Sequence, residues 1–176
     1  MCIRDSPDPS FTTDLRWAMC SDGATSTEYS NSLQVTSLQN PADFRRAVSH
    51  TADLPEPPGL EGNTVGAAVS PDGRVVAVTF ESALDGPCYI QLYRTRPPYT
   101  AFSLLYSIVN SCGSFDWWSP DGQYFLFDGP DRWYLIPVQY LLTALSSGAV
   151  SGGVLSLPSA DVFAPFEPGA PIAAIA

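Results

Sequence analysis

Residues 70–80 read SPDGRVVAVTF, and residues 119–127 read SPDGQYFLF. The aspartates of the two copies, Asp72 and Asp121, lie 49 residues apart. In each copy, four turn-forming residues stand directly before an apolar run of the length of one strand. Because internal periods of about 20–50 residues are typical of repeat folds, the pair indicates a structural unit that occurs more than once.

The four residues SPDG predict a tight turn between two antiparallel strands. Proline presets φ for the first central position of a type I turn. Aspartate tolerates the second position, and its carboxylate can accept hydrogen bonds from nearby backbone groups. Glycine supplies the left-handed residue that follows in a hairpin with a bulge. We therefore assign structural turns to Ser70, Pro71, Asp72, Gly73, Ser119, Pro120, Asp121 and Gly122.

A weaker third copy is expected upstream, at CSDG, where Asp22 lies 50 residues before Asp72 and Gly23 follows it. A short strand-like run precedes each of the three anchors: LRWAM, VGAAV and SFDWW. Third-strand runs follow at residues 31–38, 88–94 and 132–138, and a fourth strand is predicted at residues 102–108. These anchors divide the chain into approximate repeats over residues 11–50, 60–110 and 111–160, with the start of a further element over 161–176.

The predicted fold class is all-β. Four short antiparallel strands recurring every 40–50 residues, about the period of propeller repeats, indicate a partial β-propeller of about three blades. Two segments interrupt this pattern with helical signals. Residues 40–48 (NPADFRRAV) begin with an Asn N-cap and a Pro, and residues 138–148 carry apolar residues at helical spacing before a Gly. We expect one or two short helical insertions there.

The stretches VSPDGRVVAVTFES and WSPDGQYFLFDG resemble the WD-like repeat of TolB-type β-propeller proteins. The resemblance covers residues 64–138 well and residues 15–38 weakly, because Cys20 and Ser21 stand there in place of Ser-Pro. It implies a non-catalytic propeller module that binds a protein, peptide or other ligand in a periplasmic or secreted setting, beside the remaining blades of a longer protein.

Two other functions of such a propeller stay open. The first is the gating propeller of a prolyl-oligopeptidase-type serine peptidase whose catalytic domain is missing from this chain. The second is a glycosidase propeller, which would need paired carboxylates in a central channel. A propeller fold hosts many functions, so the fold alone does not choose among them.

Composition limits the partners. The net charge is −10, and all eight basic residues are arginine, which argues against nucleic acid as a partner. No apolar run approaches the length of about 18 residues that a membrane-spanning helix needs. Residues 1–6 (MCIRDS) resemble a translated sequencing-adapter remnant, as found at the ends of metagenomic gene fragments. We therefore expect residues 1–6 to be non-native, residues 7–176 to form a single partial propeller, and the natural chain to extend beyond both ends.

No catalytic, metal or cofactor residues are predicted, and we expect a binding module rather than an enzyme. His50 is the sole histidine, and no G-x-S-x-G motif accompanies it. We expect His50 at the surface or at a helix end. The four cysteines lack the ligand spacing of a zinc site, and no glycine-rich phosphate loop occurs.

The loops after the second strands hold the acidic residues Glu81, Asp85, Asp128 and Asp131. Carboxylates on such loops can attract calcium, but Asp-Gly and Pro-Asp pairs also form ordinary turns. We expect these four residues to form a rim surface that binds a partner. The third repeat also carries an aromatic cluster, for which core packing is expected and an exposed platform for a sugar or peptide is the alternative: Trp117, Trp118, Trp133 and Tyr134.

A disulfide between Cys88 and Cys112 is predicted from the strand order. In a four-stranded blade, the loop between the second and third strands opens on the same rim as the loop that leads to the next blade. Cys88 begins the third strand of the second repeat, and Cys112 lies in the connection to the third repeat. Such a bond indicates an oxidising compartment.

Overall fold

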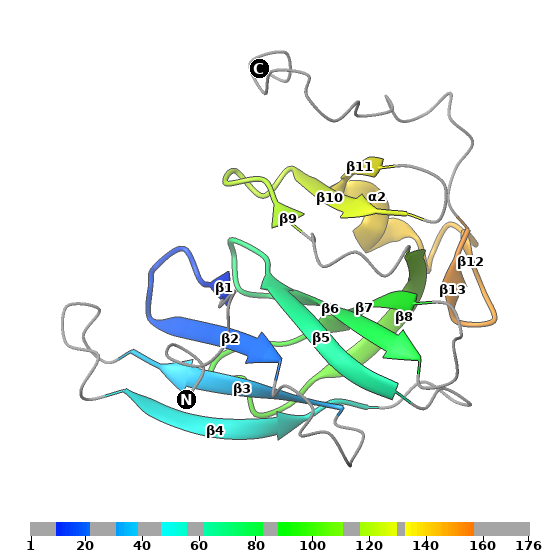
Figure 1. Cartoon of the computed structure of the whole chain (residues 1–176). Coiled ribbons are helices and arrows are strands. Elements are labelled where there is room, and N and C mark those ends of the chain that lie inside the picture. Colours follow the sequence, from blue (N-terminus) through cyan, green and yellow to red (C-terminus); the bar gives the residue numbers. More distant parts are fainter. Residues whose placement is uncertain are drawn as a thin grey trace.

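The computed structural model describes residues 10–21, 31–38, 47–55, 62–82, 88–110, 117–129 and 133–156. Strands dominate these ranges and form three sheets, called A, B and C here (Figure 1). The predicted all-β class is confirmed. The described strands close no ring, and among the same residues no helix is long and apolar enough to cross a membrane.

Sheet A contains four antiparallel strands in chain order: β1 (Ser10–Phe11), β2 (Trp17–Ser21), β3 (Ser32–Ser37) and β4 (Val48–Asp53). Alternate residues of β2 and β3, including Met19, Leu33 and Val35, point into one core. Ala18, Cys20 and Thr36, on the opposite face of these strands, are buried as well, so both faces are covered there.

The predicted strand order of the first repeat is wrong by one strand. The run LRWAM was expected to be the first strand, yet β2 is the second strand of its sheet, after β1. The run at residues 31–38 does supply the third strand, β3. Asp22 and Gly23, the turn residues predicted for this repeat, lie outside the described residues.

Sheet B begins with four antiparallel strands in chain order: β5 (Gly62–Val69), β6 (Val75–Ser82), β7 (Cys88–Arg94) and β8 (Ser103–Asn110). Val76 and Val78 of β6 pack with residues of sheet A, whereas Ala77 packs with residues of sheet C. Because both faces of sheet B are covered, successive residues of its central strands are buried rather than alternately buried and exposed, and even the polar residues Thr79 and Gln91 are buried.

Sheet C has three strands: β9 (Trp117–Trp118), β10 (Tyr124–Asp128) and β11 (Trp133–Pro137). Stacked aromatic rings connect β10 and β11, with 5.3 Å between the ring centroids of Phe127 and Tyr134. After β11 the chain enters the helix α2 (Val138–Thr143), which lies inside the segment for which a short helix was predicted. The other predicted helix falls mostly outside the described residues, and its last residue, Val48, begins β4.

The hairpin of β12 (Val150–Ser151) and β13 (Val154–Leu155) follows α2 and joins sheet B rather than sheet C. β13 runs parallel to β8, with Val154 opposite Ser107. The backbone N–H of Ser107 also donates to the carbonyl of Gly153 at 2.8 Å. Among the described residues the third repeat therefore has three strands in its own sheet instead of the expected four.

Sheet B lies between the other two sheets (Figure 1), and its first strand, β5, contacts β1, β2 and β3 of sheet A and β9 of sheet C. The first strands of the three sheets are thus neighbours in space. The connection between β7 and β8 reaches sheet A, where the Tyr99 ring packs edge-on against Trp17 at 5.2 Å. His50 Nε2 lies 3.2 Å from the carbonyl oxygen of Tyr99, so His50 sits half-buried on β4 and not at a helix end.

Candidate functional site

Three turns of one design connect the first and second strands of the three sheets. In each, a hydroxyl donates to an aspartate carboxylate two residues later, over 2.6 Å for Thr12 to Asp14, 2.7 Å for Ser70 to Asp72 and 2.5 Å for Ser119 to Asp121. The backbone N–H two residues after each aspartate donates to the same carboxylate oxygen at 3.0 Å. One side chain therefore closes each turn from within, as expected of aspartate in turns.

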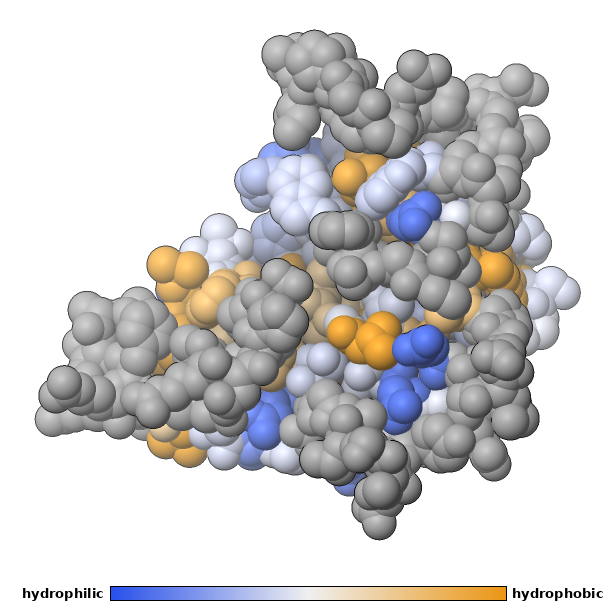
Figure 2. All heavy atoms as spheres, viewed as in Figure 1, coloured by the Kyte–Doolittle hydropathy of each residue, from blue (hydrophilic) through white to orange (hydrophobic). Residues whose placement is uncertain are grey.

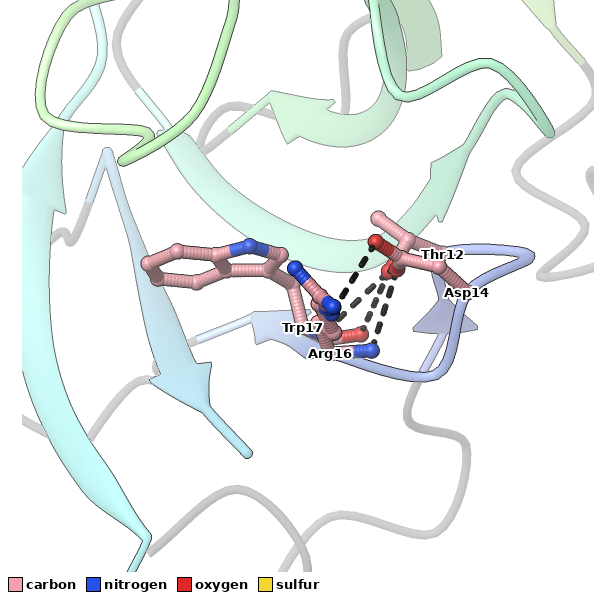
Figure 3. A network of polar contacts seen from close by, with 4 residues as sticks. All are labelled: Thr12, Asp14, Arg16 and Trp17. Atoms are coloured by element: carbon pink, nitrogen blue, oxygen red, sulfur yellow. Dashed lines mark hydrogen bonds and ion pairs between the residues drawn. The ribbon is translucent and has the colours of Figure 1, made fainter. Parts of the chain in front are cut away.

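The first of these turns, TTDLR at residues 12–16, does not have the sequence SPDG (Figure 3). Thr12 takes the place of serine and also accepts the N–H of Trp17 at 3.2 Å, as Ser70 accepts that of Val75 at 3.0 Å. The signal that could have revealed this turn is a hydroxyl residue two positions before an aspartate. Proline and glycine are not essential to its hydrogen bonds.

The hydrogen bonds favour the ionised form of two of the carboxylates. The Thr12 hydroxyl, and after it the N–H of Arg16, lowers the pKa of Asp14 below its usual value. The Ser119 hydroxyl and the N–H of Gln123 lower the pKa of Asp121 in the same way. These aspartates stabilise their own turns. Within the described ranges, no three His, Cys, Asp or Glu residues gather closely enough to hold a metal ion.

A pocket of about 610 Å³ opens between sheets B and C, where the second and third turns lie side by side. Four segments line it: the turn before β6, the segment after β7, the turn between β9 and β10, and α2. Its lining residues are Ser70, Pro71, Asp72, Arg74, Val75, Arg94, Thr95, Arg96, Trp118, Asp121, Gly122, Val138 and Leu142. The volume is within the range of about 300–1,000 Å³ typical of small-molecule sites.

The surface of the pocket is mainly apolar, and a hydrogen bond fixes one of its lining side chains. Trp118 is almost fully buried, and its Nε1–H donates to the carbonyl of Ala68 at 3.0 Å, which ties the indole to sheet B. Val75, Val138 and Leu142 complete the apolar lining. Figure 2 shows that apolar and hydrophilic residues also lie side by side elsewhere on the surface, on the face that it draws.

Three of the eight arginines of this acidic chain gather at the pocket. Arg74 Nε lies 3.9 Å from the Asp72 carboxylate, and both side chains are largely exposed. Arg94 and Arg96 form no ion pair with any described residue. The pocket therefore combines an apolar interior with cationic groups, two of which are free to meet an anion.

Thr95 fixes the backbone between the two free arginines. Its N–H donates to the carbonyl of Arg74 at 2.9 Å, and its hydroxyl donates to the carbonyl of Ala101 at 2.9 Å. Thr95 is buried, whereas Arg94 and Arg96 on either side of it are exposed. The segment after β7 is thereby attached to the turn before β6, which brings all three arginines to one pocket.

The acidic rim residues predicted from the sequence do not line this pocket. Glu81 is exposed near the far end of β6, opposite Asn63, and Asp128 ends β10, opposite Trp133. Both strands begin beside the pocket, so these two carboxylates lie toward the other end of their sheets. Asp85 and Asp131 are outside the described residues.

The aromatic cluster of the third repeat is divided between two environments. Trp118 and Tyr134 are buried in the core shared with sheet B, as expected for packing residues. Trp117 is 51 % exposed and Trp133 is half-buried. Alternate residues of a strand point to opposite faces, which explains why the neighbours Trp117 and Trp118 differ.

Cys20 and Cys88 are both buried, and each takes part in a disulfide. The partners of both bonds, and with them Cys112, lie outside the described residues. The pairing of Cys88 with Cys112 therefore stays a prediction.

Comparison with the models of known protein families finds no match, and comparison with curated proteins finds none either. The function of this chain must accordingly be argued from its own residues and geometry.

Proposed function

We propose that the chain is part of a TolB-like β-propeller and acts as a non-catalytic module that binds a protein, a peptide or another ligand. The arrangement of the first strands carries this proposal. In a propeller, the first strands of the blades surround the central axis and successive blades pack face to face. Here β1, β5 and β9 are neighbours, and each is followed by the same hydrogen-bonded turn.

In this interpretation, sheets A and B are two blades, and sheet C with α2 belongs to a third. Successive strands of a blade alternate in direction, so the first-to-second and third-to-fourth connections open on one rim. The pocket lies on that rim, because the turn before β6, the segment after β7 and the turn after β9 all line it. We assign ligand binding to this rim and keep the rim of Glu81 and Asp128 as a second surface.

A periplasmic or secreted location belongs to the same proposal. The half-cystines Cys20 and Cys88 support it, since disulfides persist in oxidising compartments and are rare in the cytosol.

Nuclear magnetic resonance with isotope-labelled protein tests the proposed function. We would add a panel of peptides and small organic acids and follow the backbone amides of Arg74, Thr95 and Gly122, which line the pocket. We expect saturable shifts that cluster at these amides, and no turnover of peptide or glycoside substrates. Shifts only at residues far from the pocket, or hydrolysis by the purified chain, would contradict the proposal.

A further inference from the structure

We propose that the pocket between sheets B and C recognises an apolar monocarboxylate, carried either by a small organic acid or by the C-terminus of a peptide. This inference rests on the proposed binding function and specifies its ligand. The lining holds three arginines and two aspartates, which leaves one positive charge in a chain whose net charge is −10.

Neither aspartate forms an ion pair with the free arginines. Asp72 and Asp121 each accept two hydrogen bonds within their own turns, from a serine hydroxyl and a backbone N–H. The side chains of Arg94 and Arg96 are therefore available to bind an anion from solution. A guanidinium group matches a carboxylate with two parallel hydrogen bonds, which makes arginine the preferred partner of such groups.

The same two aspartates argue against a multiply charged ligand. A phosphate dianion or a nucleotide would bring more negative charge than the single positive charge of the lining, close to Asp72 and Asp121. A monoanion balances the lining.

The apolar interior requires that the anion carry a hydrophobic group. Val75, Trp118 and Leu142 are contributed by three separate elements, and Trp118 cannot turn away while its Nε1–H is bonded to Ala68. A pocket of about 610 Å³ can hold an aromatic or branched aliphatic group beside a carboxylate at the arginines.

Isothermal titration calorimetry with four probes tests the inference and separates the two sources. The small probes are 3-phenylpropionate and its neutral analogue 3-phenylpropanol. The peptide probes are a peptide with a free C-terminal Phe and the same peptide with an amidated C-terminus. We expect each carboxylate probe to bind about tenfold more tightly than its neutral analogue, since a charged hydrogen bond contributes on that order.

The relative affinities of the two acids show which kind of molecule supplies the carboxylate. A peptide acid that binds more tightly than 3-phenylpropionate identifies a polypeptide C-terminus as the ligand. A peptide acid that binds equally or more weakly identifies a small acid.

Matched arginine variants locate the contact. The double variant Arg94→Gln/Arg96→Gln should weaken carboxylate binding about tenfold and leave 3-phenylpropanol unchanged. Arg16→Gln is the control, because Arg16 has the position of Arg74 in the first turn and the same 3.9 Å separation from its aspartate, yet does not line the pocket. We expect less than a twofold effect, roughly, from this exposed change.

A further variant, Leu142→Asp, controls for loss of folding. Leu142 is 48 % exposed, so Leu142→Asp should keep the fold while placing a negative charge at the pocket. It should weaken the acid probes more than the neutral probes, with unchanged circular dichroism.

Equal binding of acids and neutral analogues, or equal losses in Arg94→Gln/Arg96→Gln and Arg16→Gln, would overturn the carboxylate assignment. If neutral probes still bound at the pocket, the proposed binding function would stand even though the carboxylate assignment had failed. If no probe shifted the pocket amides, the binding function would be contradicted as well.

Discussion

Leu15 and Gly73 hold the same left-handed backbone conformation at the same position of two turns, with φ of 55° and 68°. Glycine adopts this conformation without strain, whereas a side chain with a Cβ meets the following carbonyl at a cost of roughly 1–2 kcal/mol. The first turn thus keeps the geometry of the second with a less suitable residue. Its hydrogen bonds through Thr12 and Asp14 offset that strain.

Replacing Leu15 by glycine should therefore stabilise the protein. Leu15 is 51 % exposed, so little packing is lost. Relief of backbone strain should exceed the added entropy of a glycine in the unfolded chain, for a net gain of about 0.5–1 kcal/mol in the free energy of unfolding. Urea denaturation of Leu15→Gly measures it. A lower free energy of unfolding would show that Leu15 makes contacts that outweigh its strain.

Gly73→Ala should cost more stability than Gly122→Ala. Both glycines have positive φ, 68° and 70°, so the backbone strain is matched. A Cβ at Gly73 would lie only 2.4 Å from the Tyr99 hydroxyl, whereas the nearest atom to one at Gly122 is 3.8 Å away. We expect a difference of about 1–3 kcal/mol between the two variants in urea denaturation.

Removal of the clashing hydroxyl provides the control for this pair. Tyr99→Phe should recover part of the loss in Gly73→Ala and none in Gly122→Ala. Equal losses in the two alanine variants would mean that the Tyr99 ring moves aside freely.

Stability should fall at acid pH through Asp14 and Asp121. Each carboxyl has a pKa below its usual value of 3.8 in the folded protein, so the proton binds more weakly to the fold than to the unfolded chain. Their contribution is present above the unfolded pKa and is lost as pH falls through the lowered folded pKa. Denaturation measured from about pH 6 to pH 2 should show a shallower decline in Asp14→Asn/Asp121→Asn. An unchanged slope would contradict this origin.

Peptide mapping under non-reducing conditions should recover Cys88 linked to Cys112. Closing a loop of this length stabilises by roughly 3 kcal/mol in the chain-entropy model. We therefore expect Cys88→Ser and Cys112→Ser to lose similar stability, and the double variant to lose little more than either. A fragment joining Cys88 to a different cysteine would disprove the pairing.

The outer face of sheet C should cause self-association. Trp117 and Tyr124 are 51 % and 38 % exposed, and both point away from the core that Trp118 and Phe125 enter. In the proposed propeller, this face would pack on the next blade. Sedimentation velocity should show concentration-dependent oligomers that Trp117→Thr/Tyr124→Thr reduces. The control Leu145→Thr alters an equally exposed residue and should change nothing.

The sequence predicted the second repeat because every local signal there agrees. Its turn contains both Pro71 and Gly73, and residues 75–78 that follow are continuously apolar. The turn of the first repeat was predicted at Asp22 instead of Asp14. At the true turn, Thr13 and Leu15 occupy the positions of proline and glycine, whereas CSDG has the same Ser-Asp-Gly letters as the motif. What the turn requires is the hydroxyl and carboxylate pair, which a search for SPDG does not detect.

The pocket could not be predicted from any single stretch. Arg74, Arg94 and Trp118 come from separate parts of the chain. The hydrogen bonds from Thr95 to Arg74 and from Trp118 to Ala68 help to hold these parts together. The sequence indicated the acidic loops instead, because the carboxylates within each loop lie close together along the chain.

The parallel pairing of β13 with β8 has a consequence for synthesis on the ribosome. β8 pairs with β7 as soon as both have emerged, but its other edge meets β13 only after all of sheet C and α2 have been made. During that interval the nascent chain exposes an open strand edge, the kind of surface that recruits foreign strands. A ribosome that stalls after β8 has emerged and before β13 has emerged would therefore prolong the exposure of this edge near Ser107.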